Sequence, residues 1–304
     1  MPHASRFDIT HTTSYQYEEN IHSCVMSLCM QPRNHRHQTV SSFLINTSPV
    51  TSFSVEFDAF GNRHHYFDIH HPHDKLDITV SATIEHEVQK ELSDGFALPQ
   101  AAWSELESLK NDWDMWEYLR FTDLTTVSES LTNWLSTFQT TQDDDPYSRL
   151  KALTQHMFES FDYQPGTTHV DSTIDHFLDI KAGVCQDYAH LMIAVARSWG
   201  IPARYVSGYL YDSDENNLRA ANATHAWIEC WLPQLGWMPF DPTNSKVDDE
   251  NLITVAIGRD YQDVAPSRGI TFGGGRSELS VDVNVKRGLV ESNPPLSGHR
   301  NMQQ

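Results

Sequence analysis

The chain has 304 residues, with 21 lysine and arginine residues against 41 aspartate and glutamate residues, so its formal net charge is −20. A chain of this length exceeds the usual size of one hydrophobic core and predicts two packed units, or one core with a large accessory layer. The negative charge repels phosphate backbones and anionic lipid, so neither nucleic acid nor a membrane surface is expected as a partner.

The N-terminus and the cysteines indicate a cellular compartment. The opening "MPHASRFDITHTT" lacks a basic start followed by an apolar stretch, and the longest apolar run, "LMIAVA" at 191–196, is too short to span a membrane. The four cysteines show neither a CxxC spacing nor the density of a disulfide scaffold. We therefore expect a cytoplasmic protein.

Residues 5–90 contain short segments with alternating polarity, such as "SFSVEFDAF" and "KLDITVSATIEHEV", separated by turn-forming residues such as "GN" at 61–62. This pattern predicts antiparallel strands that form a β-sandwich. Eleven of the 17 histidines fall before residue 87, including "HRH" at 35–37 and "HHPHD" at 70–74. Because no companion cysteine or HExxH pattern accompanies them, we interpret them as exposed loop histidines rather than metal ligands.

The pattern changes to a helical one between residues 101 and 160. The segments "WSELESLKNDWDMWEYL" and "SESLTNWLSTF" repeat apolar residues at steps of three and four, and "DDDPYSRLKALTQHMFESF" begins with acidic residues and a proline, as helices often do. A polar linker is expected at 136–146.

The segment "AGVCQDYAHLM" places Cys185 directly after a glycine and at the start of a predicted helix, which continues to Trp199 and ends at Gly200. A cysteine taken alone is more often a small core residue than a nucleophile. At a helix N-terminus, however, the partial positive charge of unpaired N–H groups favours the thiolate. The backbone N–H of the same residue is also placed to stabilise a negatively charged carbonyl oxygen.

Downstream, "ARYVSGYLY" predicts a strand and "HAWIECWLPQLGWMPFDPTN" predicts a hairpin that turns at "PQLG". His225 begins the first strand of this hairpin and Asp241 lies near the end of the second. A cysteine nucleophile needs a base, and the imidazole needs a carboxylate or amide that sets its tautomer. Cys185, His225 and Asp241 supply all three groups, although each by itself would be an ordinary structural residue.

The hairpin register decides whether this constellation can form, because facing residues of an antiparallel pair share one side of the sheet. If the four residues "PQLG" alone joined the strands, Ile228 would face Asp241, and the carboxylate would point away from His225. We therefore predict a register shifted by one residue, through a five-residue connection or a bulge, with Trp227 opposite Asp241.

The segments "GVCQDYAHLM" and "THAWIECWLPQLGWMPFDPTN", with the order Cys, His, Asp, resemble the transglutaminase-like superfamily of papain-type cysteine enzymes. The resemblance extends upstream through "FDYQPGTTHVDSTIDHFLDIKAG". Near the start of the chain, "YQYEENIHSCVMSLCMQPR" and "FDAFGNRHHYFDI" resemble the β-rich N-terminal domain of bacterial members. The helical stretch near 95–145 matches only loosely.

This resemblance implies an α+β chain whose papain-like, transglutaminase-like core follows a β-sandwich-like N-terminal domain. It also implies that Cys185 is the nucleophile, that His225 is the general base and acid, and that Asp241 orients the imidazole. No cofactor and no metal ligand are expected. The predicted divisions are a β-rich domain at 1–95, a helical connection at 96–145, and a catalytic core with a C-terminal strand segment at 146–304.

Several residues near the predicted site are interpreted as structural. Asp187 and His190 follow the nucleophile on the same helix but do not share its face. Cys230 lies on the apolar side of its strand. Cys24 and Cys29 have no base nearby in the sequence, so we interpret both as core residues.

The expected reaction is attack of the thiolate on a carboxamide or peptide carbonyl of a protein or peptide substrate, followed by transfer of the thioester to water or to an amine. Hydrolysis by a protease or isopeptidase is marginally preferred over transamidation, and a non-catalytic scaffold is the third alternative. Tyr163 and Gln164 are guesses for the second oxyanion donor. The segment "YDSDENN" at 211–217 is only a weak candidate for a calcium loop. The sequence leaves the oligomeric state open.

Overall fold

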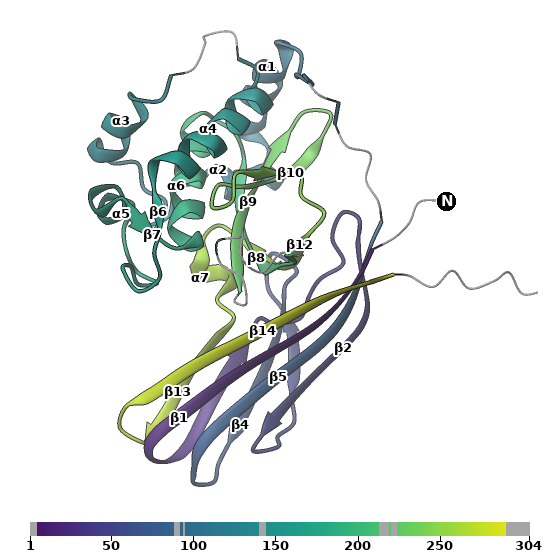
Figure 1. The fold of residues 1–304 in the computed structure, drawn as a ribbon, viewed down its shortest axis with the longest axis vertical. Coiled ribbons are helices and arrows are strands. Elements are labelled where there is room, and N and C mark those ends of the chain that lie inside the picture. Colours follow the sequence, from purple (N-terminus) through teal and green to yellow (C-terminus); the bar gives the residue numbers. More distant parts are fainter. Residues whose placement is uncertain are drawn as a thin grey trace, which may run out of the picture.

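A computed structural model describes residues 5–87, 92–93, 95–139, 144–212, 219 and 224–289. In Figure 1 a helix-rich unit sits above a long, curled β-sheet. One antiparallel sheet of seven strands forms the lower unit, so the predicted sandwich-like domain is built from a single sheet that curls. Its strands are β1 (Ser5–Leu28), β2 (Gln38–Ser48), β3 (Ser54–Phe57), β4 (Arg63–Ile69), β5 (His73–His86), β13 (Ser267–Gly273) and β14 (Ser277–Leu289).

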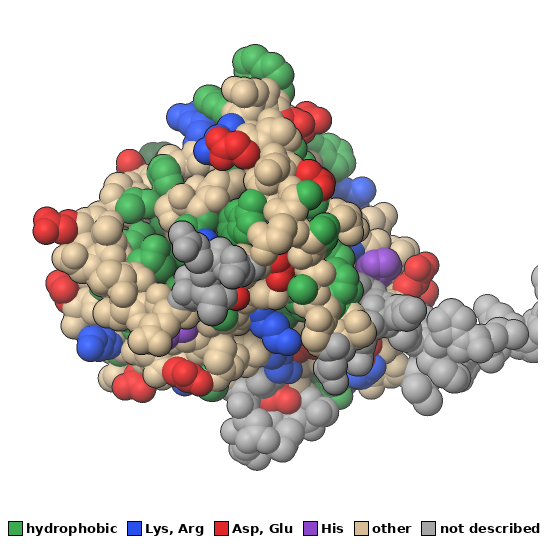
Figure 2. Space-filling view, turned by 90° about the horizontal axis from the view of Figure 1, so that it is seen from above, with side chains coloured by type: hydrophobic (Ala, Val, Ile, Leu, Met, Phe, Trp, Pro, Cys, Tyr) green, Lys and Arg blue, Asp and Glu red, His purple; other side chains and the backbone are tan. Residues whose placement is uncertain are grey.

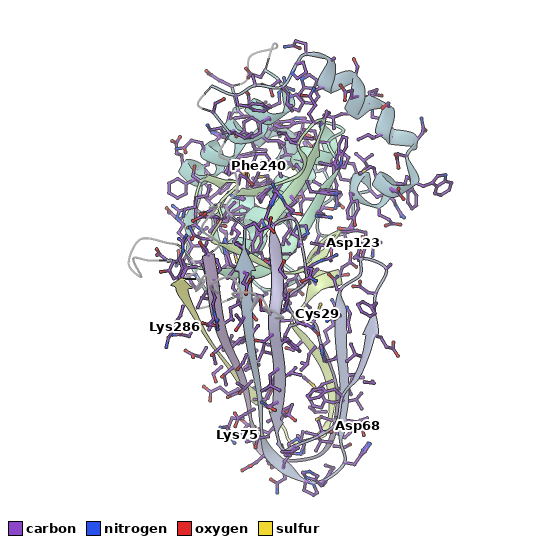
Figure 3. The ribbon with its side chains drawn as sticks, turned by 90° about the vertical axis from the view of Figure 1, so that its right-hand side faces the viewer. Cys29, Asp68, Lys75, Asp123, Phe240 and Lys286 are labelled. Carbon is purple, nitrogen blue, oxygen red and sulfur yellow. The ribbon has the colours of Figure 1, made fainter. Side chains whose placement is uncertain are left out.

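Strand β1 organises this sheet because it is long enough to pair with four other strands. Its first part lies between β5 and β14, and its last part lies between β4 and β13. The register shifts near Ile21, where the partners change. Bulges of this kind bend a strand and increase its twist, which accounts for the curl. Figure 3 shows Asp68 and Lys75 at the end of the sheet far from the helical unit.

The last two strands, β13 and β14, follow the core in sequence but pair with β1 in the N-terminal sheet. The C-terminal strand segment, grouped with the catalytic core by sequence, therefore belongs to the N-terminal sheet in space (Figure 1). The chain crosses from the sheet to the core and back again.

The interpretation of the N-terminal histidines as exposed loop residues is wrong for several of them. His11, His65 and His73 lie on strands and are buried, with exposed fractions of 1%, 5% and 8%. His11 reaches the core, where its Nδ1 hydrogen-bonds the Tyr209 hydroxyl at 3.0 Å. Alternation along a strand buries every second side chain, and an imidazole is tolerated there when it finds a partner.

The predicted helical stretch is confirmed as a series of short helices followed by one longer helix that packs on the core. They are α1 (Ala101–Ser108), the 3₁₀ helix η1 (Leu109–Asn111), α2 (Trp113–Leu119), α3 (Glu129–Leu135) and α4 (Pro146–Ser160). Helix α4 begins with the capping carboxylate of Asp145, which accepts the backbone N–H of Tyr147 at 3.0 Å. Pro146 occupies the first turn, where its missing N–H is not needed.

The core is a five-stranded antiparallel sheet, in the order β11-β10-β9-β8-β12, packed against helix α6. Helix α6 is buried from Gln186 to Arg197 and contacts the apolar side of β9, which includes Ile228 and Cys230. The remaining core elements are β6 (Asp162–Tyr163), α5 (Ile174–Ile180), β7 (Ala182–Gly183), α6 (Cys185–Ser198), β8 (Ala203–Leu210), β9 (His225–Leu232), β10 (Gly236–Asp241), β11 (Lys246–Val247), β12 (Leu252–Gly258) and α7 (Tyr261–Val264).

Two amide side chains of the N-terminal unit bind the edge strand β12 of the core. Gln38 donates to the carbonyl of Thr254 and accepts its N–H, both at 2.8 Å. Asn62 does the same for Ile257, at 2.7 and 2.9 Å. The edge of a sheet carries unpaired backbone groups, and here side-chain amides satisfy them. The two units are therefore joined by directional hydrogen bonds as well as by apolar packing.

Candidate active site

The turn before α6 brings Cys185 to the first position of that helix. Gly183 packs so closely that a Cβ would lie 2.6 Å from the Asp187 carboxylate and 2.8 Å from the Phe177 ring, so only glycine fits. Val184 is the extended N-cap, and its backbone N–H donates to Asp187 Oδ2 at 2.8 Å. The Cys185 side chain is consequently half-buried at a helix N-terminus, as predicted.

The hairpin of β9 and β10 has the register that the sequence required. Trp231 lies opposite Trp237, with five residues between them, and Ile228 lies opposite Phe240. Continuing this register places residue 227 opposite Asp241, on the same side of the sheet as His225. The prediction of a shift by one residue is confirmed, and the side chains of His225 and Asp241 project from one face.

His225 and Asp241 form a hydrogen-bonded pair that is closed to solvent. His225 Nε2 donates to Asp241 Oδ2 at 2.8 Å, and both side chains are 0% exposed. Two further donors reach the carboxylate: the backbone N–H of Thr243 at 3.0 Å from Oδ1, and the Nδ2 of Asn244 at 2.8 Å from Oδ2. The sequence analysis missed Asn244, although it directly follows the "DPT" that marked the end of the hairpin.

Burial alone would lower the pKa of His225. The charge of Asp241 and its hydrogen bond, together with the Cys185 thiol, outweigh burial and raise the pKa of His225 to about 10. For Asp241 burial acts in the opposite sense, and His225 together with the other donors holds its pKa below the usual value. Asp241 engages Nε2, so Nδ1 is the ring nitrogen left for the thiol, and it has no other hydrogen-bond partner among the described residues. The arrangement suits proton exchange between thiol and imidazole.

The two other titratable residues near the start of α6 serve the scaffold. Asp187 caps the helix and also accepts a hydrogen bond from Thr168 Oγ1 at 2.7 Å. His190 is buried, which lowers its pKa to about 3, and its Nε2 accepts the backbone N–H of Tyr261 at 3.2 Å. Both side chains are engaged in hydrogen bonds within the scaffold, which agrees with their structural interpretation.

The two candidates for the second oxyanion donor differ in their surroundings. The backbone N–H of Gln164 donates to the Gly183 carbonyl at 2.9 Å, so it is already engaged. Tyr163 pairs with Gly183 in the short parallel sheet of β6 and β7. Burial first, and then the charge of Cys185, raise the pKa of Tyr163, so its hydroxyl keeps its proton.

The remaining cysteines are buried, as expected. Cys24 does have an imidazole nearby, which the sequence did not reveal: its Sγ lies 4.0 Å from Nε2 of His73. Burial nevertheless raises the pKa of Cys24, raises that of Cys29 to about 12, and raises that of Cys230. Thiols that stay protonated and have no access to solvent are poor nucleophiles. Only Cys185 combines exposure with a polarised imidazole among the described residues.

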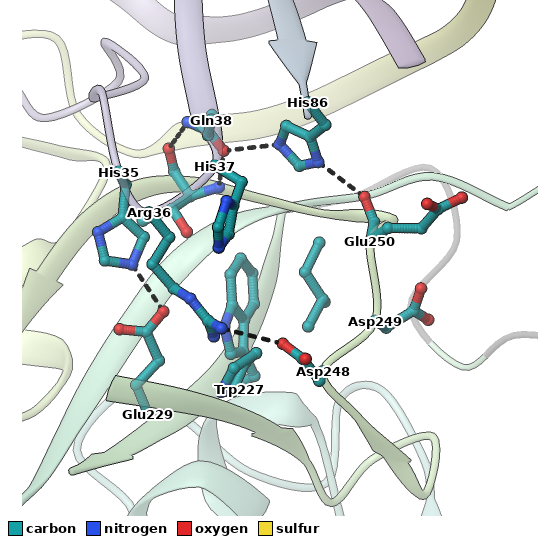
Figure 4. Close-up of a pocket in the computed structure, with 13 residues that line it drawn as sticks. His35, Arg36, His37, Gln38, His86, Trp227, Glu229, Asp248, Asp249 and Glu250 are labelled. Atoms are coloured by element: carbon teal, nitrogen blue, oxygen red, sulfur yellow. Dashed lines mark hydrogen bonds and ion pairs between the residues drawn. The ribbon is translucent and has the colours of Figure 1, made fainter. Parts of the chain in front are cut away.

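A small cavity of about 40 Å³ lies at the junction of the two units rather than at Cys185 (Figure 4). His35 contacts the buried carboxylate of Glu229 at 2.7 Å, and His86 hydrogen-bonds the carbonyl of Glu250 at 2.8 Å. Trp227 lines the cavity and stacks against His225, with ring centroids 6.0 Å apart. Such a volume holds only a few water molecules, so the cavity is too small for a peptide side chain. Its lining residues come from both units, so it belongs to their junction.

The described residues contain no group of three or more His, Cys, Asp or Glu side chains arranged to hold a metal ion. The weak calcium candidate at 211–217 lies mostly outside the residues that the structure describes. In the same part of the chain, no helix is both long and apolar enough to cross a membrane.

Comparison with known proteins gives a family match for each of the two units. Residues 135–242 match the transglutaminase-like superfamily, and residues 7–85 match the bacterial transglutaminase-like N-terminal region. An uncharacterised protein of Mycobacterium leprae is 34% identical over 284 residues, which cover 93% of this chain and 99% of that protein. A protein-glutamine gamma-glutamyltransferase of Pseudomonas aeruginosa is 38% identical over 105 residues, or 32% of this chain and 16% of that protein.

Among solved structures, a protein of Cytophaga hutchinsonii described as a candidate cysteine protease superimposes with a TM-score of 0.73. The match covers 95% of this chain and 92% of that chain at 21% identity, so it shows the shared fold. The mixed α/β architecture, with its β-rich N-terminal region, is therefore found in an experimental structure as well.

Proposed function

Because the chain belongs to the transglutaminase-like superfamily, we propose that it is a cysteine-dependent enzyme that acts on amide or peptide bonds through a thioester on Cys185. One observation carries this proposal. The buried His225–Asp241 pair leaves one imidazole nitrogen for a half-buried thiol at a helix N-terminus. A buried ion pair is weak support for stability alone, so its retention beside a thiol favours a chemical role.

In the proposed reaction the Cys185 thiolate attacks the carbonyl carbon, and the carbonyl oxygen becomes negatively charged. The backbone N–H of Cys185 at the start of α6 stabilises that charge. His225, held as imidazolium by Asp241, gives its proton to the departing amine or ammonia, and the thioester remains. His225 then accepts a proton from the incoming water or amine, which attacks the thioester and releases the Cys185 thiolate, so the thiolate–imidazolium pair is restored.

Two outcomes of the second step remain in competition. Hydrolysis is our preferred outcome, because the half-buried thiol leaves the thioester within reach of water. The local similarity to the Pseudomonas glutamyltransferase favours the second candidate, transfer of a glutamine acyl group to an amine. Both candidates take a protein or peptide as substrate. A non-catalytic scaffold is the third alternative, which the presence of all three side chains disfavours.

Mass spectrometry can separate these outcomes. Purified enzyme and its Cys185→Ala variant are incubated with glutamine-rich proteins in heavy-oxygen water, with and without a primary-amine probe. Cleaved peptides with heavy oxygen at the new carboxylate indicate a protease, glutamate with heavy oxygen indicates an amidase, and probe adducts indicate a transferase. Products that also form with Cys185→Ala, or no product from any substrate, would contradict the proposal.

We also propose, as the cysteine pattern suggested, that the protein works in the cytoplasm. The four free thiols of the described residues suit a reducing compartment. Fractionation of the producing cells would test this.

A further inference from the structure

The carboxylate of Asp241 is held by more donors than the imidazole alone. Oδ2 accepts both His225 Nε2 and Asn244 Nδ2, each at 2.8 Å, and Oδ1 accepts the backbone N–H of Thr243 at 3.0 Å. The side chain of Asp241 is 0% exposed, so water does not replace a missing donor readily. Each bond therefore contributes to where the carboxylate points.

The orientation of the Asn244 amide follows from its other end. Its Oδ1 accepts the backbone N–H of Arg219 at 3.0 Å, which leaves Nδ2 as the end that meets Asp241. A flipped amide would set two acceptor oxygens against each other and would turn the NH₂ group toward the Arg219 N–H. The hydrogen-bond network thus admits one orientation, with the donor toward the carboxylate.

An amide has a specific advantage at this place. A lysine or arginine beside Asp241 would form its own ion pair and would weaken the hold of the carboxylate on the imidazolium. Asn244 contributes one hydrogen bond and no charge, so the negative charge of Asp241 remains available to His225. The turn after β10 makes this contact local, because Asn244 follows Asp241 by three residues.

We propose that Asn244 is a positioning residue, which holds the Asp241 carboxylate in the orientation that His225 needs to act on Cys185. This inference rests on the proposed function of the triad. Asn244 acts on the Cys185 thiol only indirectly, through Asp241 and then His225. Loss of the Asn244 side chain is expected to destabilise the charged form of His225 and, through it, the Cys185 thiolate. It removes none of the three proposed catalytic side chains.

The test follows the alkylation of Cys185 by iodoacetamide as a function of pH, which needs no knowledge of the substrate. We expect Asn244→Ala to lower the rate about tenfold at mildly acidic pH and to move the acidic midpoint upward by about one pH unit, the effect of one hydrogen bond to a charged group. Asn244→Asp has the same size and keeps the acceptor for Arg219, but it places a second carboxylate beside Asp241. The repulsion displaces the Asp241 carboxylate and the added negative charge disfavours the Cys185 thiolate, so a shift in the same direction is expected for it.

A matched control is Asn251→Ala, because Asn251 Nδ2 donates to Asp249 Oδ1 at 2.7 Å in a similar amide–carboxylate pair away from the triad. It should leave the alkylation profile unchanged. Thermal unfolding of each variant shows whether the fold persists. If the alanine variant does not fold, the isosteric Asn244→Asp variant provides the alkylation profile instead.

The outcomes distinguish a failure of the Asn244 proposal from a failure of the proposed triad. A wild-type pH profile in both Asn244 variants, in a protein whose alkylation still depends on His225, would overturn the role of Asn244 alone. A Cys185 alkylation rate that does not change in His225→Ala would overturn the triad and this inference with it. A shift in both Asn244 variants, absent from Asn251→Ala, supports the positioning role.

Discussion

Two cysteines of the chain, Cys185 in the core and Cys24 in the N-terminal sheet, have different surroundings, and we expect these to decide their reactivity. Cys185 and Cys24 both lie near an imidazole, but the imidazole near Cys185 is held by a buried carboxylate, whereas His73 donates its Nδ1–H to the carbonyl of His71 at 2.8 Å. Nε2 of His73 is then the ring nitrogen that faces the Cys24 thiol, and no carboxylate holds this ring as Asp241 holds that of His225. A cysteine and a histidine side by side are therefore not sufficient for a nucleophile; charge and exposure decide.

The first prediction concerns the order of thiol labelling. A limiting dose of iodoacetamide at mildly acidic pH should alkylate Cys185 first, because the other three thiols are buried and burial raises their pKa. His225→Ala should slow the labelling of Cys185 without abolishing it, since the helix N-terminus remains. Peptide mapping over a time course measures all four rates in one sample. Labelling of any buried cysteine at the rate of Cys185 would contradict these assignments.

A second prediction separates the roles of the triad members. Asp241→Asn should reduce the rate about ten- to a thousand-fold, because an amide oxygen still accepts the imidazole N–H but carries no charge. The turnover rate of the Cys185→Ala variant should fall to the background rate, since no other group replaces the sulfur. Turnover of any substrate found in the heavy-oxygen experiment provides the measurement. Equal residual activity in the two variants would be inconsistent with the assigned roles.

At the scale of elements, the start of α6 depends on one close approach. The short strand β7 ends at Gly183, whose backbone lies against the Phe177 ring of α5 and the Asp187 carboxylate of α6. Three elements thus converge on one residue without a side chain. This packing sets where the helix begins, and with it the position of Cys185.

Gly183→Ala is the third prediction. The added methyl group would meet atoms at 2.6 and 2.8 Å, so the helix start must shift, and the free energy of unfolding should fall by about 1–3 kcal/mol. The matched control is Gly288→Ala in β14, where a Cβ meets nothing within 4 Å. Urea denaturation measures both, and alkylation of Cys185 shows whether the site moved. A Gly183→Ala protein as stable as Gly288→Ala would refute the close-packing argument.

At the scale of the whole molecule, the two units are interdependent. The N-terminal sheet is completed by β13 and β14 from beyond the core, and the core edge strand β12 is covered by Gln38 and Asn62 of the sheet. On the face seen in Figure 2, acidic and basic side chains are dispersed and form no patch of one sign. The junction itself is held by buried amides, by apolar contacts and by ion pairs such as that of His35 with Glu229.

The fourth prediction tests this junction. Asn62→Ala removes a donor and an acceptor from Ile257 and should lower the free energy of unfolding by roughly 1–3 kcal/mol, because both backbone groups of a buried residue lose their partners. Hydrogen exchange should accelerate at the Ile257 N–H in particular. A matched substitution, Asn46→Ala, changes an asparagine of β2 that lies outside the junction. Unchanged exchange at Ile257 would show that Asn62 does not hold the edge strand.

The site was predictable where its signals are local. The glycine before Cys185, the helical spacing after it and the alternation of the hairpin each depend on near neighbours in the chain. The hairpin register followed from a geometric requirement and is confirmed. Asn244 and the Cys24–His73 contact were missed, because the first depends on how a turn folds back and the second joins strands 49 residues apart.

The sequence by itself determined the family, the mixed α/β class and the order of Cys185, His225 and Asp241, because motif spacing and polarity patterns are properties of short segments. Only the tertiary structure decided that the last strands return to β1, that three N-terminal histidines are buried, and that side-chain amides close the edge of β12. These features depend on pairings between distant segments. Such pairings form where the whole chain satisfies its buried backbone and polar groups at once, and no local pattern encodes them.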